Sequence, residues 1–224
     1  MPVEIAENIA KVRQRIRAAC AACGREEASV TLLGVSKTRP AQDIRAAVSA
    51  GLPDIGENYL QEALAKMPAL ADLPVIWHFI GPIQSNKTRA IAESFAWAHS
   101  VDRLKIAQRL SEQRPAHLPP LSVCLQVNVS REDSKSGCDP AALPALAEAV
   151  RALPRLRLRG LMTIPEPGAG SGAFETLRAA LDALRQRWPE LDTLSMGMSA
   201  DFEAAIAAGA THVRIGTDIF GARR

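Results

Sequence analysis

The chain has 224 residues, of which 47% are hydrophobic and 23% are charged, and its formal net charge is +3. This length is enough for a large core and is common for an α/β barrel that forms one domain. So small a net charge excludes the strongly basic footprint of a nucleic-acid-binding protein. No stretch approaches the roughly 20 apolar residues of a membrane span, and residues 1–10 lack the apolar core of a secretion signal. We therefore expect a cytoplasmic protein with neither a nucleic-acid nor a membrane partner.

The four cysteines and four histidines form no pattern typical of a metal site or a disulfide framework. Cys20 and Cys23 match C-x-x-C, but they end a helical pattern, follow no strand and have no second pair to complete a zinc site. A chain of this size without an export signal needs no disulfide framework. The histidines show no ligand spacing, so we expect no metal.

In chain order, the predicted elements begin with a helix over 3–22 and then alternate between strands and helices. The expected strands are 30–36, 53–57, 75–80, 95–100, 121–128, 157–164, 192–196 and 210–215. The expected helices are 40–50, 58–67, 85–93, 102–113, 140–152, 173–187 and 200–208. Alternation of this kind predicts parallel strands with helical crossovers, and eight strands predict a single (β/α)8 TIM barrel over 1–224 with the added N-terminal helix over its bottom. An open doubly wound sheet is the alternative.

Lys37 ends the first predicted strand, in the stretch T-L-L-G-V-S-K-T-R-P that runs from Thr31 to Pro40. It is the only one of six lysines that directly follows an apolar strand-like run. Apolar surroundings disfavour the ammonium form, lower the pKa and free the amine to attack an aldehyde. This predicts a Schiff-base lysine at the carboxyl end of a strand, where α/β proteins place their chemistry. The alternative is a strand-end lysine that extends to water or pairs with a carboxylate.

Polar and sulfur-containing side chains gather at other expected strand ends. Asn58 follows the second strand, His78 lies in the third, and Met162 is near the end of the sixth. Because these ends meet at one face of a barrel, we include all three in the expected binding set. Each has a simpler explanation, since Asn58 is a plausible helix cap, as are Glu57 and Asp102, and His78 is a plausible core histidine.

Two other lysines compete with Lys37 for the role of reactive amine. Lys87 begins a predicted helix and Lys135 lies in a polar loop over 130–137. Solvation keeps the ammonium form of such lysines stable, so neither is expected to be the reactive amine.

The loops after the seventh and eighth strands predict a phosphate site. Gly197 and Ser199 follow one strand, and Gly216 and Thr217 follow the other. Barrels bind phosphate at these two loops, where glycine lets backbone N–H groups approach and a helix start adds positive potential. The alternative is that Ser199 only caps its helix and that the glycines only form turns.

In a closed barrel the eighth strand lies beside the first, so the phosphate site and Lys37 are neighbours. Pyridoxal 5′-phosphate (PLP) fits this arrangement, with its aldehyde at Lys37 and its phosphate at the two loops. Arg214, two residues before Gly216, is placed to point into the barrel at the pyridine nitrogen. An arginine there donates a hydrogen bond and leaves the nitrogen unprotonated, so we expect a weak carbanion stabiliser.

Motifs along nearly the whole chain, from Lys37 to Arg223, occur together in one known family. They are V-S-K-T, G-E-N-Y-x-Q-E, W-H-F-I-G-x-x-Q-x-N-K, S-V-D, Q-V-N-x-S-x-E-x-x-K-x-G, G-L-M-x-I, S-M-G-M-S-x-D and V-R-I-G-x-x-I-F-G-x-R. The chain thus resembles the pyridoxal phosphate homeostasis protein family, whose fold is similar to the barrel domain of alanine racemase. The resemblance implies a Schiff base on Lys37, phosphate contacts from Ser199, Gly216 and Thr217, and Arg214 at the pyridine nitrogen.

The resemblance also implies a carrier or regulator of intracellular PLP supply that has no established turnover and whose partners include PLP-dependent apo-enzymes. An amino-acid racemase is the first alternative, but this chain lacks the second domain from which the resembled racemase takes its second base, and Tyr59 is its single tyrosine. The missing domain also leads us to expect a monomer. The second alternative is a class I aldolase on a sugar phosphate, with Glu57 or Asp102 as acid and base.

Overall fold

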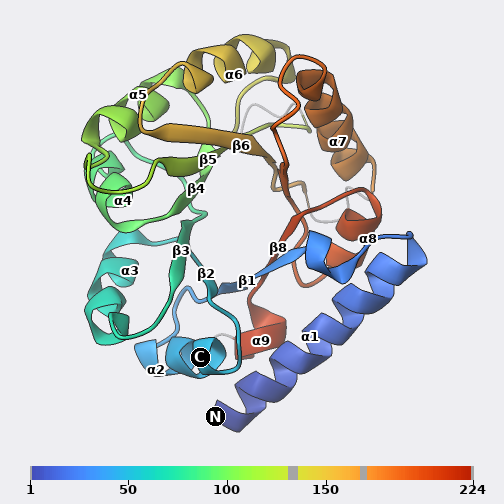
Figure 1. Ribbon diagram of the computed structural model, residues 1–224. Helices are drawn as coiled ribbons and strands as arrows, with labels where there is room; N and C mark the ends of the chain where they lie inside the picture. Colours follow the sequence, from blue (N-terminus) through green and yellow to red (C-terminus); the bar gives the residue numbers. More distant parts are fainter. Residues whose placement is uncertain (1, 131–135, 167–170, 223–224) are drawn as a thin grey trace.

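The computed structural model describes residues 2–130, 136–166 and 171–222, and it contains a closed barrel of parallel strands in the order β1 to β8 with helices around it (Figure 1). The strands are β1 (Thr31–Val35), β2 (Asp54–Glu57), β3 (Ile76–Phe79), β4 (Trp97–Val101), β5 (Leu121–Gln126), β6 (Leu156–Met162), β7 (Thr193–Ser195) and β8 (His212–Ile215). The α-helices are α1 (Pro2–Ala22), α2 (Ala41–Ser49), α3 (Leu60–Lys66), α4 (Thr88–Ser94), α5 (Leu104–Gln113), α6 (Leu143–Arg151), α7 (Gly172–Arg185), α8 (Phe202–Ala207) and α9 (Thr217–Phe220). Short 3-10 helices lie at Glu27–Ser29, Met67–Leu70 and Pro140–Ala142.

The predicted barrel is confirmed, and each expected strand overlaps an observed one. The open doubly wound sheet is wrong, because β8 pairs in parallel with β1 from Thr31↔His212 to Gly34↔Ile215 and so closes the ring. This pairing also brings the end of β1 beside the end of β8, as the sequence predicts.

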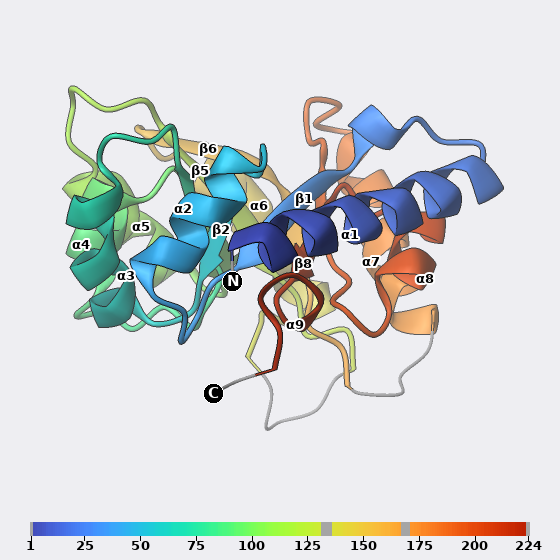
Figure 2. The same cartoon turned by 90° about the horizontal axis from the view of Figure 1, so that it is seen from below.

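The sequence analysis expected the first helix to cover the bottom of the barrel, and this expectation is wrong. It lies along the flank, against α2, α8 and α9 (Figures 1 and 2). The reason is that α9, which follows β8, has only four residues and leaves the outer side of β8 and β1 bare. The buried stripe of α1, from Ile5 to Cys20, joins the main core there and takes the place of a full eighth helix.

The two sides of the strands carry different chemistry. Outward-facing residues such as Val213 and Ile215 join one large apolar core beneath the helices. Inside the barrel, a separate apolar cluster contains only Leu33, Val35 and Ile80. Much of the remaining interior is polar and buried, with His78, His99, Ser195 and Arg214 among its residues. None of the helices in the described ranges is long and apolar enough to cross a membrane.

Candidate cofactor site

Lys37 lies in a tight turn directly after β1. The N–H of Arg39 donates to the carbonyl oxygen of Ser36 at 3.0 Å, which places Lys37 and Thr38 at the two central positions of the turn. Thr38 has a φ of 65°, in the left-handed region where turns usually have glycine or asparagine. For a β-branched residue this conformation costs about 1–3 kcal/mol, and it persists only where neighbouring contacts hold it.

The direction of the Lys37 side chain follows from the strand that precedes it. Leu33 and Val35 belong to the apolar cluster inside the barrel, and side chains alternate along a strand. Continuing this alternation places Lys37, which is half-buried, on the interior side. The apolar strand that carries it is therefore the environment expected for a reactive amine.

A buried ion-pair cluster holds this turn from the helical side of the sheet. The carboxylate of Glu62 accepts from the N–H of Thr38 at 2.6 Å and from Lys66 Nζ at 2.8 Å. Lys66 Nζ also donates to Glu57 Oε1 at 2.5 Å and to the carbonyl oxygen of Ser36 at 3.0 Å. Burial raises the pKa of Glu57, and the hydrogen bonds from Lys66 and Ser36 oppose that rise. The strained turn around Lys37 is thus fixed by charged groups on β2 and α3.

Glu57 and Asp102, the acid-base candidates of the aldolase alternative, are both engaged elsewhere. Glu57 is on the same side of β2 as Ile55, which packs beneath α2, so it faces the helices and not the barrel interior. Asp102 forms an ion pair with the adjacent Arg103 at 2.8 Å. Neither contact places a carboxylate beside the Lys37 amine.

Arg214 points into the barrel, as the sequence predicts. It is 4% exposed, and its guanidinium donates to Ser195 Oγ and to the carbonyl oxygen of Thr163, both at 2.9 Å. Burial lowers the pKa of Arg214 to about 10, so the side chain stays protonated at neutral pH. A guanidinium has five N–H donors and no acceptor, and it can therefore only donate to a ligand above it.

The two expected phosphate loops lie beside each other. The carbonyl oxygen of Gly197 accepts from the N–H of Arg214 at 3.0 Å, which joins the loop after β7 to β8. Gly197 has a φ of 91°, and a Cβ there would lie 2.6 Å from Ala205 Cβ, so the loop requires glycine. Ser199 follows in this loop and is half-buried.

The second loop starts at Gly216, directly before α9. A Cβ on Gly216 would lie 3.3 Å from the carbonyl oxygen of Val35, two residues before Lys37. Thr217 is the exposed first residue of α9. Arg39 completes the junction, because its Nη2 donates to the carbonyl oxygens of Gly221 and Ala222 at 2.5 and 2.6 Å. The Lys37 turn and the second phosphate loop therefore belong to one corner of the barrel.

The three remaining expected residues differ in their surroundings. Asn58 is half-buried, and within the described part of the chain its Oδ1 is buried without a hydrogen-bond partner. Met162 is fully buried at the end of β6. The ring nitrogens of His78, in contrast, are occupied by Asp54 at 3.0 Å and His99 at 2.9 Å. All three stay predictions as cofactor contacts, and His78 is the one whose ring nitrogens are already engaged in the barrel interior.

The sequence analysis missed several buried polar residues that lie beneath Arg214. Ser195 Oγ contacts His99 Nδ1 at 2.8 Å as well as Arg214, and both Ser195 and His99 are inaccessible to solvent. The period of two along a strand could have found Ser195, which lies two residues before Gly197. It could not have found His99, because the register of β4 shifts between Ala98 and Val101, and Val101 belongs to the outer apolar core. Their partners on other strands cannot be inferred from that spacing.

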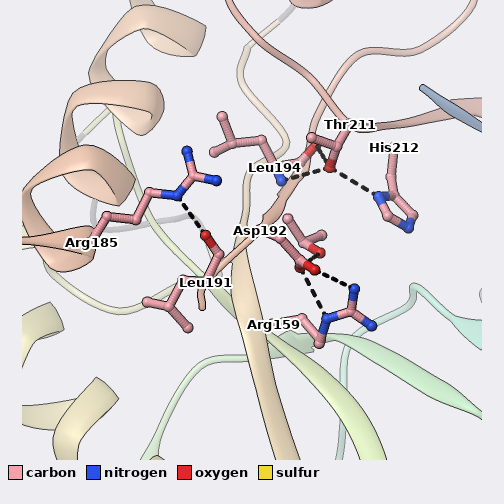
Figure 3. Close-up of polar contacts among 8 residues, drawn as sticks. Arg159, Arg185, Leu191, Asp192, Leu194, Thr211 and His212 are labelled. Carbon is pink, nitrogen blue, oxygen red and sulfur yellow. Dashed lines mark hydrogen bonds and ion pairs between the residues drawn. The ribbon is translucent and has the colours of Figure 1, made fainter. Parts of the chain in front are cut away.

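A second polar layer closes the barrel at the amino ends of β6, β7 and β8 (Figure 3). Arg159 pairs with Asp192, and Thr211 Oγ1 lies 3.0 Å from His212 Nδ1 and accepts from the N–H of Leu194 at 2.9 Å. Burial lowers the pKa of His212 to about 3, so its imidazole is neutral at ordinary pH. In the described ranges, no three His, Cys, Asp or Glu side chains are grouped to hold a metal ion.

The arrangement fits PLP. An amine-bearing strand end lies beside two glycine loops, and a buried guanidinium points into the same end of the barrel. Among the described residues, the buried amide oxygen of Asn58 has no hydrogen-bond partner. In this arrangement Ser199, Gly216 and Thr217 would hold the phosphate, and Arg214 would hold the ring nitrogen. When bound, PLP supplies an aldehyde that condenses with amines and a ring that withdraws electrons.

Fold and site together define a TIM barrel of the alanine racemase type. The family model described as alanine racemase, N-terminal domain, matches residues 4–224. A pyridoxal phosphate homeostasis protein of Pseudomonas aeruginosa is 70% identical over 98% of this chain and 96% of its own length, and one of Escherichia coli is 56% identical over 98% and 97%. The solved structure of PipY from Synechococcus elongatus with PLP bound superposes with a TM-score of 0.84, at 39% identity over 97% of this chain and 100% of that one. The chain belongs to the pyridoxal phosphate homeostasis protein family.

Proposed function

We propose that this chain binds PLP as a Schiff base on Lys37 and takes part in the intracellular supply of PLP, without efficient catalytic turnover. In this proposal residues 1–224 form one PLP-binding barrel domain. The observation that carries it is the junction of β1 and β8, where the Lys37 turn, the Gly216 loop and the buried Arg214 meet. The PLP in the PipY structure and the names of the curated relatives support it.

The residue at the ring nitrogen favours carriage over catalysis. Arg214 is buried among Ser195 and Thr163 and stays protonated at neutral pH, so it donates a hydrogen bond and leaves the pyridine nitrogen without a proton. An unprotonated ring withdraws fewer electrons from a carbon attached to the cofactor than a protonated one. The site thus holds PLP while offering weak support to carbanion chemistry.

The absorbance spectrum of the purified protein tests the assignment of Lys37. We expect the band of lysine-bound PLP in the natural protein and its loss in Lys37→Ala, with circular dichroism showing an unchanged fold. Lys87→Ala is the matched control, because Lys87 is another half-buried lysine and lies at the start of α4. An unchanged spectrum in Lys37→Ala, or loss of the band only in the control, would contradict the proposal.

An amino-acid racemase is the competing activity. Racemisation needs a base on each face of the bound substrate. The single tyrosine, Tyr59, is 56% exposed at the N-terminus of α3, where an exposed side chain has no fixed position from which to act as the second base. We expect L- and D-amino acids incubated with the PLP-loaded protein to keep their chirality over hours, whereas inversion that is lost in Tyr59→Phe would establish a racemase.

The proposed partners are PLP itself and PLP-dependent apo-enzymes, and the proposed state is a cytoplasmic monomer. All four cysteines are free thiols in the structure, as in proteins of a reducing compartment. Sedimentation of the loaded protein tests the monomer. Transfer of PLP to an apo-enzyme, followed by recovery of that enzyme's activity, tests the carrier role against a Lys37→Ala control.

A further inference from the structure

A continuous chain of hydrogen bonds runs through the barrel interior beneath the cofactor site. Arg214 Nη1 donates to Ser195 Oγ at 2.9 Å, and Ser195 Oγ lies 2.8 Å from His99 Nδ1. His99 Nε2 lies 2.9 Å from His78 Nδ1, and His78 Nε2 lies 3.0 Å from Asp54 Oδ1. The four links join residues on β8, β7, β4, β3 and β2, so the chain crosses the barrel from one side to the other.

This chain of hydrogen bonds joins the two ends of the barrel. Arg214 lies beside the phosphate loops, because its N–H donates to the carbonyl oxygen of Gly197. Asp54 is the first residue of β2, and its side chain is 20% exposed. There it lines a hollow of about 580 Å³ at the amino ends of the strands, together with Arg13 of α1 and Glu27. Solvent therefore reaches the Asp54 end, whereas His78, His99 and Ser195 in the middle of the hydrogen-bond chain are fully buried.

The proton positions along this chain follow from the Asp54 end. A carboxylate accepts, so His78 donates to it through Nε2–H, and a neutral His78 then has a bare Nδ1 that accepts from His99 Nε2–H. A neutral His99 in turn has a bare Nδ1, which accepts the hydroxyl proton of Ser195. The Ser195 oxygen is then left with only lone pairs to offer, and these accept from Arg214. Each of the four hydrogen bonds thus has a defined donor and acceptor, and all four point from Arg214 toward Asp54.

The surroundings keep both histidines neutral. Burial lowers the pKa of His78, although the hydrogen bond and charge of Asp54 oppose this effect. Burial also lowers the pKa of His99, well below its ordinary value, with smaller contributions from His78, His212 and Arg214. The ring of Trp97 stacks on His78 with centroids 5.5 Å apart, and the neutral ring of His212 lies 6.0 Å from His99 and 6.4 Å from His78. The guanidinium of Arg159, which pairs with Asp192, lies over the ring of Trp97, 4.8 Å from its centroid. His78, His99 and Ser195 are inaccessible to solvent, so the hydrogen bonds within this chain determine which ring nitrogen carries each proton.

We propose that Asp54, His78, His99 and Ser195 are positioning residues for Arg214, forming a one-direction relay that orients its guanidinium toward the ring nitrogen of PLP. The proposal rests on the proposed function for its ligand, but the relay exists in the protein alone. Ser195 occupies one N–H of the guanidinium and Thr163 another, which fixes the plane of the group. Asp54 fixes the tautomers that allow Ser195 to accept. An ordered donor loses less entropy on binding than one that must first find its orientation.

The relay is tested first in the PLP-free protein, by the ring ¹⁵N chemical shifts of the histidines at neutral pH. We expect Nε2–H tautomers for both His78 and His99. A His99 that carries its proton on Nδ1, or that is doubly protonated, would overturn the proposal whatever the protein does with PLP. This measurement needs no variant and so does not depend on one that folds.

Two variants then test the link to the cofactor. Asp54→Asn keeps the size of the side chain but lets its amide donate, so we expect the single tautomer of each histidine to become a mixture. Ser195→Ala removes one of the two acceptors of the Arg214 guanidinium and leaves the carbonyl oxygen of Thr163. We expect PLP to bind about tenfold more weakly and its absorbance band to shift, as for the loss of a hydrogen bond to a charged group. The control is Asp72→Asn, since the side chain of Asp72 is 62% exposed and pairs with Arg45 at the surface.

The outcomes separate the two proposals. The expected tautomers in a protein that never shows a Lys37-dependent band would leave the relay standing and refute PLP binding. A Lys37-dependent band in a protein whose His99 is protonated on Nδ1 would do the reverse. If Ser195→Ala binds PLP with unchanged affinity and an unchanged spectrum, the residues of the relay do not position Arg214, and the inference is wrong.

Discussion

Replacing Lys66 with methionine tests the buried ion pair that holds the Lys37 turn. The side chain of Lys66 is 9% exposed and that of Glu57 is fully buried, with Lys66 Nζ 2.5 Å from Glu57 Oε1. Methionine fills a similar volume but leaves Glu57 with only the hydroxyl of Ser36 as a donor. Removing one partner of a buried pair costs about 3–5 kcal/mol, a large part of the roughly 5–15 kcal/mol that stabilises a folded domain.

The stability lost in Lys66→Met should increase as the pH rises. The pKa of Glu57 is already raised by burial, and Lys66 lowers it, so Lys66→Met raises it further. A carboxyl group whose pKa is higher in the folded than in the unfolded state binds more protons when folded, and the folded state therefore loses stability as pH rises above the ordinary pKa of glutamate. The deficit of Lys66→Met is thus expected to be smaller at pH 5 than at pH 7.

Urea unfolding at the two pH values measures both effects, with Lys66→Met/Glu57→Gln as the matched variant. Because glutamine has no charge to bury, the double variant should recover most of the lost stability and its pH dependence. A loss below about 1 kcal/mol in Lys66→Met, or a double variant in which the two losses simply add, would refute the view that an unpaired buried carboxylate is the cause.

Three further changes test local features of the site and fold. Thr38→Gly relieves the left-handed backbone of the Lys37 turn, and we expect the unfolding free energy to rise by about 1 kcal/mol and the melting temperature by about 2–4 °C; a lower melting temperature would contradict this. Gly197→Ala should cost about 1–3 kcal/mol, since its φ is 91° and its Cβ would lie 2.6 Å from a side-chain carbon. A Cβ on Gly172 would meet no atom of the described residues within 4 Å, so Gly172→Ala should be neutral in the same urea titration. Cys23 is exposed, so a thiol reagent should label it first in the native protein, while burial raises the pKa of Cys138 to about 11 and protects it; equal labelling at both by mass spectrometry would contradict the buried position of Cys138.

Much of the candidate site follows from where strands end. The apolar run before Lys37, the glycines at 197 and 216 and the position of Arg214 are local features of the sequence, and the structure brings them to one corner of the barrel. This works because parallel strands carry their chemistry at their carboxyl ends, so that knowing each strand's last residue is enough to bring these residues together.

Other features depend on partners that are distant in sequence. Glu57 meets Lys66 and Ser36 on the helical side of the sheet, and nothing in its own neighbourhood distinguishes that from a helix cap. Both ring nitrogens of His78 are engaged by Asp54 and His99, and nothing in its own neighbourhood in the sequence indicates these partners. The position of α1 was likewise set by the shortness of α9, at the other end of the chain.

The sequence by itself determined the alternation of strands and helices, the barrel, and the residues at its strand ends, because periodicity and strand termini are properties of neighbouring residues. Only the tertiary structure decided which buried polar groups pair across the barrel. Ser195 and His99 are 96 residues apart, and they come together only because ring closure sets the stagger of all the strands at once. A buried hydrogen bond depends on that stagger to within a fraction of an ångström, and no local pattern specifies it.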